Sequence, residues 1–224
     1  MADQNVEQDS LFKEIDEDLR QQKYAELWRK YGKFVIGASI ALVLGVASVK
    51  GWEAYDQNRK VTDSKQLLSA LNSIDKTKLD DANTILDNII KNGSAGYAIL
   101  ARLNKAAILA KGGERTKAIE SYLSIANDTV IERDLRDLAI IMSAQLGLGH
   151  MDSKLFLVRL EKLIDGGNAW RHSAKELSAL FAQNSGDRTR ALQLYTELSD
   201  DATAPSGIRS RAAEMSTILG DINN

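Results

Sequence analysis

The two histidines, His150 and His172, are the first residues to test for metal or acid–base chemistry. Neither stands in a cluster of His, Asp and Glu with the spacing of a metal site. His150 closes the run Leu-Gly-Leu-Gly-His, which superficially resembles a glycine-rich phosphate loop. The run follows a helical stretch rather than a strand and lacks the third glycine, so we reject a nucleotide site. We expect both histidines to be surface or turn residues.

Paired acidic residues occur at Asp80-Asp81 and Asp200-Asp201, where we expect helix starts and ends rather than a catalytic site. The first pair suits the positive end of a helix dipole. The chain has no Gly-x-Ser-x-Gly nucleophile motif and no cysteine, which excludes a thiol nucleophile, a disulfide and a thiolate metal site. The sequence therefore predicts no catalytic residue, no cofactor and no metal, and a protein that is not an enzyme.

The composition favours helices and disfavours a nucleic-acid partner. Lysine and arginine number 29 against 31 acidic residues, a net charge of -2, whereas phosphate binding needs clustered basic residues. Hydrophobic residues make up 44% of the chain, which is enough for a packed core. A single proline, Pro205, and few β-branched runs argue against a sheet-rich domain, so we predict an all-α fold.

Residues 34–49 form an uncharged run, FVIGASIALVLGVASV, of sixteen residues. That length is at the short edge of a membrane span and also fits a buried core helix. Lys33 and Lys50 bracket the run and can snorkel to the headgroups, while Trp28 and Trp52 suit the two interfaces. Its Phe, Ile, Leu and Val residues favour insertion by about 3 to 5 kcal/mol before the small and polar residues subtract. We predict a transmembrane helix over residues 34–52.

Basic residues set the expected orientation of this span. Five lie on its N-terminal side against four more dispersed ones on the other, which places the N-terminus in the cytoplasm. Residues 1–33 then form a cytoplasmic leader with an amphipathic helix, which either lies on the membrane or docks to a partner. Residues 53–224 face the periplasm of a Gram-negative cell. A signal peptide cleaved near Val46-Ala47-Ser48 is the competing interpretation, but a long leader of acidic and basic residues is a poor fit to one.

Gly37, Ala41 and Gly45 recur every four residues within the apolar run and share one helix face. Small residues at that spacing let a second helix approach closely. The pattern is consistent with helix pairing in the membrane and with a homo-oligomer.

The region after residue 53 contains an internal repeat. Residues 113–128 read GERTKAIESYLSIAND and residues 186–201 read GDRTRALQLYTELSDD, an offset of 73 residues. Halving the offset finds two weaker copies, which places Ala82, Ala118, Leu155 and Ala191 at equivalent positions. A period just above 34 residues built from two helices is the tetratricopeptide arrangement. We expect about four such units.

Specific residues strengthen the resemblance to tetratricopeptide repeats. Ala106 and Ala179 each lie twelve residues before Ala118 and Ala191, like the small residues at which the two helices of a repeat cross. Tyr122 matches the following aromatic position. The resemblance implies an α-solenoid whose concave surface, lined by the first helix of each repeat, binds proteins. Its groove-facing positions would be Leu103, Ala107, Lys111, Ile140, Glu176 and Gln183. The alternative is that residues 57–72 or 204–220 of the chain itself fill this groove.

The order of leader, span and degenerate repeats resembles the YfgM-type family of bacterial inner-membrane proteins. The stretches FKEIDEDLR at residues 12–20 and LWRKYG at residues 27–32 resemble the leader of that family. The resemblance implies an ancillary subunit of the SecYEG translocon that works beside periplasmic chaperones, including a PpiD-like foldase, on emerging secreted proteins. A scaffold for envelope assembly or cell division, or a purely structural homo-oligomer, would use the same architecture.

Overall fold

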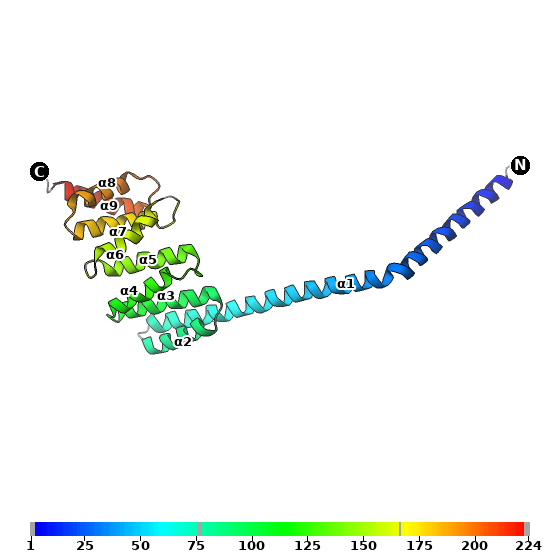
Figure 1. Cartoon of the computed structure of the whole chain (residues 1–224), viewed down its shortest axis with the longest axis horizontal. Coiled ribbons are helices and arrows are strands. Elements are labelled where there is room, and N and C mark those ends of the chain that lie inside the picture. The colour runs from blue at the N-terminus through cyan, green and yellow to red at the C-terminus, as the bar shows by residue number, and fades with distance from the viewer. Residues whose placement is uncertain (1–2, 76–77, 166, 222–224) are drawn as a thin grey trace. The chain divides into compact units, whose positions relative to one another are not determined.

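The computed structural model describes the backbone of residues 3–75, 78–165 and 167–221, and the side chains of 25–74, 78–165 and 167–220. Every regular element in these ranges is an α-helix, as the sequence predicted. The chain divides into two units, residues 1–58 and 59–224. The first unit contains most of helix α1 (Asp3–Asp75), and the second contains its end and helices α2 to α9 (Figure 1).

The apolar part of α1 has its side chains exposed and its polar groups satisfied within the helix. Phe34 is 77% exposed and Leu42 is 70% exposed. The hydroxyls of Ser39 and Ser48 each donate to the backbone carbonyl four residues earlier at 2.8 Å, so neither needs a partner outside the helix. Between Ala25 and Ile74 the helix is long and apolar enough to cross a membrane, and 6% of its most apolar window is buried. It is therefore a candidate membrane span rather than a core helix.

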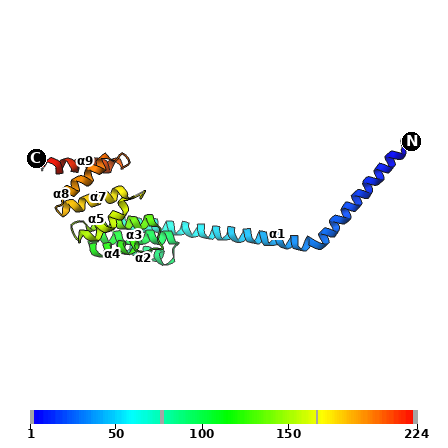
Figure 2. The same ribbon diagram turned by 45° about the horizontal axis from the view of Figure 1, so that its top comes forward.

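The second unit is a stack of helix pairs that follow one another in chain order (Figures 1 and 2). From α2 onward, helices that are neighbours in the chain pack on each other, and α5 also contacts α7, which in turn contacts α9. The end of α1 pairs with α2, α3 with α4, α5 with α6, and α7 with α8, while α9 closes the stack. The bounds are α2 Leu79–Asn92, α3 Ala95–Lys111, α4 Arg115–Ala126, α5 Arg133–Gly147, α6 Ser153–Ile164, α7 Arg171–Asn184, α8 Arg188–Asp200 and α9 Ser206–Asp221.

Glycine turns join the two helices in three of the four pairs. Gly113, Gly149 and Gly186 have φ values of 82°, 73° and 83°, a region that L side chains rarely adopt. In two of these turns the residue after the glycine donates its backbone N–H to a carbonyl five residues earlier: Glu114 to Leu109 and Asp187 to Ala182, each at 2.9 Å. The repeated sequence motif therefore folds into a repeated helix–turn–helix.

The buried residues define four repeats with one register. In the second helix of each pair, one residue is buried together with the residues four and seven positions after it. The first of these is Ala82 in α2, Ala118 in α4, Phe156 in α6 and Ala191 in α8. Twelve residues before each lies a fully buried alanine of the first helix: Ala70, Ala106, Ala144 and Ala179. The predicted register is confirmed in three repeats and wrong by one residue in α6, where Leu155 is only partly buried.

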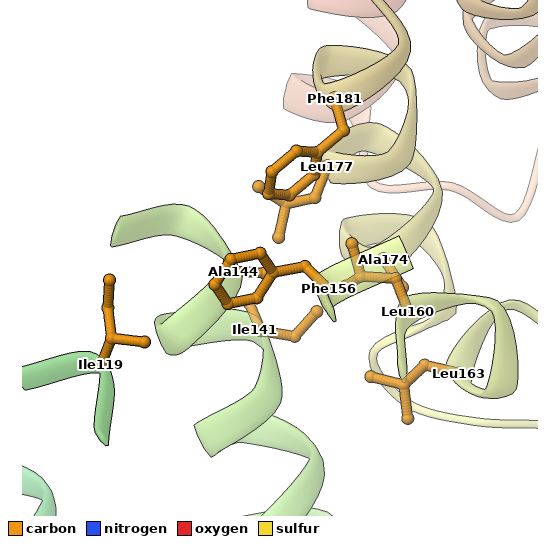
Figure 3. Close-up of a cluster of buried hydrophobic side chains, with 9 residues drawn as sticks. All are labelled: Ile119, Ile141, Ala144, Phe156, Leu160, Leu163, Ala174, Leu177 and Phe181. Carbon is orange, nitrogen blue, oxygen red and sulfur yellow. The ribbon is translucent and has the colours of Figure 1, made fainter. Parts of the chain in front are cut away.

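The third repeat accommodates a phenylalanine where the others have alanine. A Cβ atom added to Gly147, at the end of α5, would lie 2.3 Å from the ring of Phe156. The missing side chain at Gly147 thus makes room for the ring. Phe156 also stacks on Phe181 of α7, with ring centroids 5.5 Å apart (Figure 3). At the crossing of α5 with α6, a phenylalanine therefore replaces the alanine of the second helix, Ala144 keeps its place on the first helix, and Gly147 leaves the space for the ring.

Candidate protein-binding surface

The six positions predicted to face a groove all lie on first helices, but their surroundings differ. In α3, Leu103 is 9% exposed and belongs to a buried cluster shared with α4 and α5. Ala107 is half-buried, and Lys111, the last residue of α3, is exposed. Lys111 and Ala107 are therefore the α3 positions that a partner could contact without displacing the core.

The two positions in α7 contact the elements that follow it. Arg211 of α9 donates through Nε and Nη2 to the two carboxylate oxygens of Glu176, at 2.8 and 3.0 Å. The hydroxyl of Tyr195 in α8 donates to Oε1 of Gln183 at 3.2 Å. Burial, with a smaller contribution from the charge of Glu176, raises the pKa of Tyr195 to about 12, so this hydroxyl stays protonated. Both predicted binding residues thus also hold the end of the stack together.

Ile140 of α5 lies beside a hollow bounded by α4, α5 and α6. The register of α6 explains why Ile140 lies beside the hollow and not in the core. The crossing residue of α6 is Phe156 rather than Leu155, so the α5 position that corresponds to Leu103 is 141 rather than 140. Ile141 is 7% exposed and lies in the core of the third repeat. Ile140 instead adds an apolar side chain to the wall of the hollow.

The hollow has a volume of about 490 Å³ and a basic lining that sequence reasoning missed. Four cationic side chains line it, Arg133 and Arg136 from α5 and Arg159 and Lys162 from α6, together with Ala126, Asn127, Asp137, Ile140, Val158 and Leu163. In each helix the two cations are three residues apart and so share one face. That spacing was visible in the sequence, but only the packing of the helices brings the two pairs to one hollow.

The acidic residue in this lining is already engaged. Oδ2 of Asp137 accepts a hydrogen bond from the Asn168 side chain at 2.8 Å and lies 3.5 Å from Nε of Arg133. Asp137 is buried, so its carboxylate depends on these partners. It therefore neutralises about one of the four positive charges, and the hollow keeps a net positive charge.

A second, smaller hollow of about 210 Å³ lies among α6, α7 and α8. Its charged lining is mixed and includes Glu161, Asp187 and Arg190. Such a lining favours no single ligand charge.

The small residues predicted to pair membrane helices lie on an uncovered part of α1. A Cβ atom added at Gly37 or at Gly45 would meet nothing within 4 Å. Gly45 also lines a shallow apolar depression with Leu42, Val46 and Val49. Helix pairing through Gly37, Ala41 and Gly45 stays a prediction.

The two histidines differ in environment. His150 is exposed in the α5–α6 turn, as predicted, but His172 is 7% exposed, so its prediction as a surface residue is wrong. The loop between α8 and α9 covers it: Nε2 of His172 lies 3.0 Å from Asp201 and 3.3 Å from Thr203. Hydrogen bonds from Thr203, with a smaller contribution from His172, lower the pKa of Asp201 to about 2. Among the described residues, no group of three or more His, Asp or Glu could hold a metal ion.

Comparisons with known proteins agree with this architecture. A family described as a tetratricopeptide repeat-like domain matches residues 25–207. A relative from Aggregatibacter actinomycetemcomitans, named ancillary SecYEG translocon subunit, is 23% identical over 195 residues, which cover 85% of this chain and 92% of the relative. No solved structure matches the chain. The chain therefore belongs to the tetratricopeptide repeat-like domain family, as one of its YfgM-type members.

Proposed function

We propose that this protein is a membrane-anchored scaffold without enzymatic activity, and that it serves as an ancillary subunit of the SecYEG translocon. One observation carries the proposal: an exposed apolar helix segment and a tetratricopeptide-like array occur together in one chain. An apolar segment of this kind is stable in lipid, and stacked helix pairs offer an extended surface for proteins. The translocon is proposed as the partner because the relative from Aggregatibacter actinomycetemcomitans is named an ancillary SecYEG translocon subunit.

The anchor would span the inner membrane once, over residues 34–52, with residues 1–33 in the cytoplasm and 53–224 in the periplasm. The bias of lysine and arginine toward the N-terminal flank supports this orientation. Because the chain has no cysteine, single introduced cysteines report topology without background. With a membrane-impermeant maleimide in cells with a permeabilised outer membrane, Ser206→Cys should react and Ser10→Cys should not. Labelling of Ser10→Cys alone would reverse the orientation.

The repeats would contact secreted proteins as they emerge and work beside a PpiD-like foldase. Such a role needs a surface on the same side of the membrane as the emerging chain, which the proposed orientation provides. It needs no catalytic group.

The decisive experiment is affinity purification of the tagged protein after brief cross-linking in living cells. SecY and a periplasmic foldase should be recovered well above the level found with a tagged, unrelated single-span protein. Recovery of division or cell-wall proteins instead would reject the translocon and leave the anchored scaffold. Loss of all partners, with recovery of a second tagged copy only, would favour the structural homo-oligomer.

The contact face can be mapped in the same cells with a photo-cross-linking amino acid. Lys111 is the exposed predicted groove position, and Lys154, exposed on the second helix of the third repeat, is the matched control. Cross-links from position 111 and none from position 154 would support binding on the first-helix surface. Cross-links from position 154 alone would place that contact elsewhere.

A further inference from the structure

We propose that the hollow bounded by α4, α5 and α6 is a docking site for an acidic segment of a partner polypeptide. The inference rests on the proposed protein-binding function and adds the chemistry of one partner. It concerns the basic hollow defined above, whose cationic lining is Arg133, Arg136, Arg159 and Lys162.

The cations of the hollow are incompletely paired within the chain. Nε of Arg136 is buried and has no hydrogen-bond partner among the described residues. The nearby carboxylate of Asp128 is already occupied by Arg102 at 2.8 Å and by the backbone N–H of Val130. A buried donor without a partner is unfavourable, and a carboxylate docked in the hollow would compensate the charge of this guanidinium.

An ordinary structural role accounts for only part of this lining. Lys162 lies in the last turn of α6, where a cation complements the helix dipole, and Arg159 donates to the carbonyl of Leu155 at 3.0 Å. Neither explanation applies to Arg136, which lies in the first half of α5. Arg133 is paired with Asp137. Asp128 interacts with the charge of Arg136 but forms its ion pair with Arg102, so Arg136, Arg159 and Lys162 form no ion pair with a carboxylate among the described residues.

The shape and composition of the hollow favour a peptide as the ligand. Three of the four cations are arginines, whose planar guanidinium binds a carboxylate through two parallel hydrogen bonds. Ile140 and Leu163 supply apolar walls, and Val158 is 58% exposed beside them. The hollow thus fits an acidic residue next to an aliphatic one.

An anionic lipid surface fits less well, because exposed acidic residues occur on the same two helices. Asp134 on α5 and Glu161 on α6 are exposed and would be repelled by such a surface. The acidic cluster of the chain itself, at residues 14–18, precedes the apolar segment and is kept on the other side of the membrane when α1 spans it. The occupant is therefore a segment of another protein.

Fluorescence anisotropy with the full chain in nanodiscs of zwitterionic phosphatidylcholine tests this site. The probe is a labelled twelve-residue peptide of Glu, Asp and Leu, compared with a peptide in which Gln and Asn replace the acids. We expect Arg136→Gln to weaken binding of the acidic peptide about tenfold and Lys162→Gln about threefold. Arg136→Lys should fall between wild type and Arg136→Gln, because it keeps the charge but loses the planar fork. Lys154→Gln, an exposed cation on α6 outside the hollow, is the matched control and should change nothing.

Three results would overturn the proposal: equal binding of the acidic and amide peptides, equal weakening by Lys154→Gln, or displacement of the peptide by water-soluble dihexanoyl phosphatidylglycerol at a lower concentration than by unlabelled acidic peptide. The last result would make the hollow a lipid-headgroup site. Circular dichroism of each variant separates lost binding from lost folding. Recovery of SecY with the same variants separates this inference from the proposed function, since either can fail while the other stands.

Discussion

Replacing Gly147 by alanine tests the packing that distinguishes the third repeat. The added methyl would lie 2.3 Å from two ring atoms of Phe156, far inside van der Waals contact. Phe156 is fully buried and stacked on Phe181, so its ring has little room to retreat (Figure 3). The helices α5 and α6 must separate, or the ring must leave its preferred rotamer.

The expected magnitude is the difference of two opposing effects. Overpacking a core by one methyl costs about 1 to 3 kcal/mol. Glycine to alanine within a helix gains about 0.5 to 1 kcal/mol, and less at a helix end such as Gly147. We therefore expect Gly147→Ala to lower the unfolding free energy by about 1 kcal/mol, equivalent to about 2 to 4 °C in Tm for a chain of this size.

A second substitution, at Phe156, should remove or reverse the effect of Gly147→Ala on the unfolding free energy. Phe156→Leu removes the ring atoms that collide with the methyl group, although alone it is destabilising because it leaves a cavity. In the Phe156→Leu background, Gly147→Ala should become neutral or stabilising, since only the helix-propensity gain remains. The coupling energy of the double-mutant cycle should be about 1 kcal/mol or more.

Urea unfolding of the full chain in mild detergent, followed by far-ultraviolet circular dichroism, measures each free energy. Gly96→Ala in α3 is the matched control, because a Cβ atom there would meet nothing within 4 Å. It should be neutral or slightly stabilising. A Gly147→Ala protein as stable as the Gly96→Ala protein, or the same penalty with leucine at position 156, would refute the close contact.

The contacts around α7 to α9 set three further expectations. Glu176→Gln weakens the pair with Arg211, and because Arg211 is mostly exposed the loss in unfolding free energy should be about 0.5 to 1 kcal/mol in urea. Tyr195→Phe removes a hydrogen-bonded hydroxyl and should cost about 1 kcal/mol in the same assay. Hydrogen bonds from Thr203 are the main cause that lowers the pKa of Asp201 from 3.8 to about 2. The stabilisation of the fold by the Asp201 carboxylate is therefore complete above about pH 3.8 and is lost as the pH falls through about 2. Asp201→Asn should remove this part of the acid-induced fall in Tm, and an unchanged pH profile would contradict the assignment.

The sequence predicted the repeats where their two copies are alike. The stretches around Ala118 and Ala191 share turn glycines, crossing alanines and a buried tyrosine, and the structure places all three features equivalently. The spacing then led to Ala82, whose repeat takes its first helix from the end of α1, with Ala70 at the crossing. Residues 57–72, considered as a possible filler of the groove, thus include part of that helix.

The register of the third repeat could not be read from the sequence. Phe156 replaces the small residue by which the other crossings are recognised, and Gly147, which compensates for it, resembles an ordinary helix-ending glycine. Two residues that compensate for each other leave no pattern in a single chain. The burial of His172 also could not be predicted from the sequence, because the residues that shield it from solvent lie in a loop about thirty residues later.

The candidate binding surfaces differ in how far contacts within the chain already occupy them. On the first helices, Glu176 and Gln183 already bind Arg211 and Tyr195, so a partner there would have to compete with contacts that hold α8 and α9. Lys111 carries no such internal bond among the described residues, which leaves the α3 end of that surface more accessible. The cations of the basic hollow, in contrast, come from the first helix α5 and the second helix α6, and Arg136 among them keeps a donor without a partner among the described residues. We therefore expect a partner that binds without destabilising the stack to use α3 or the basic hollow, and one that binds at Glu176 to loosen α9.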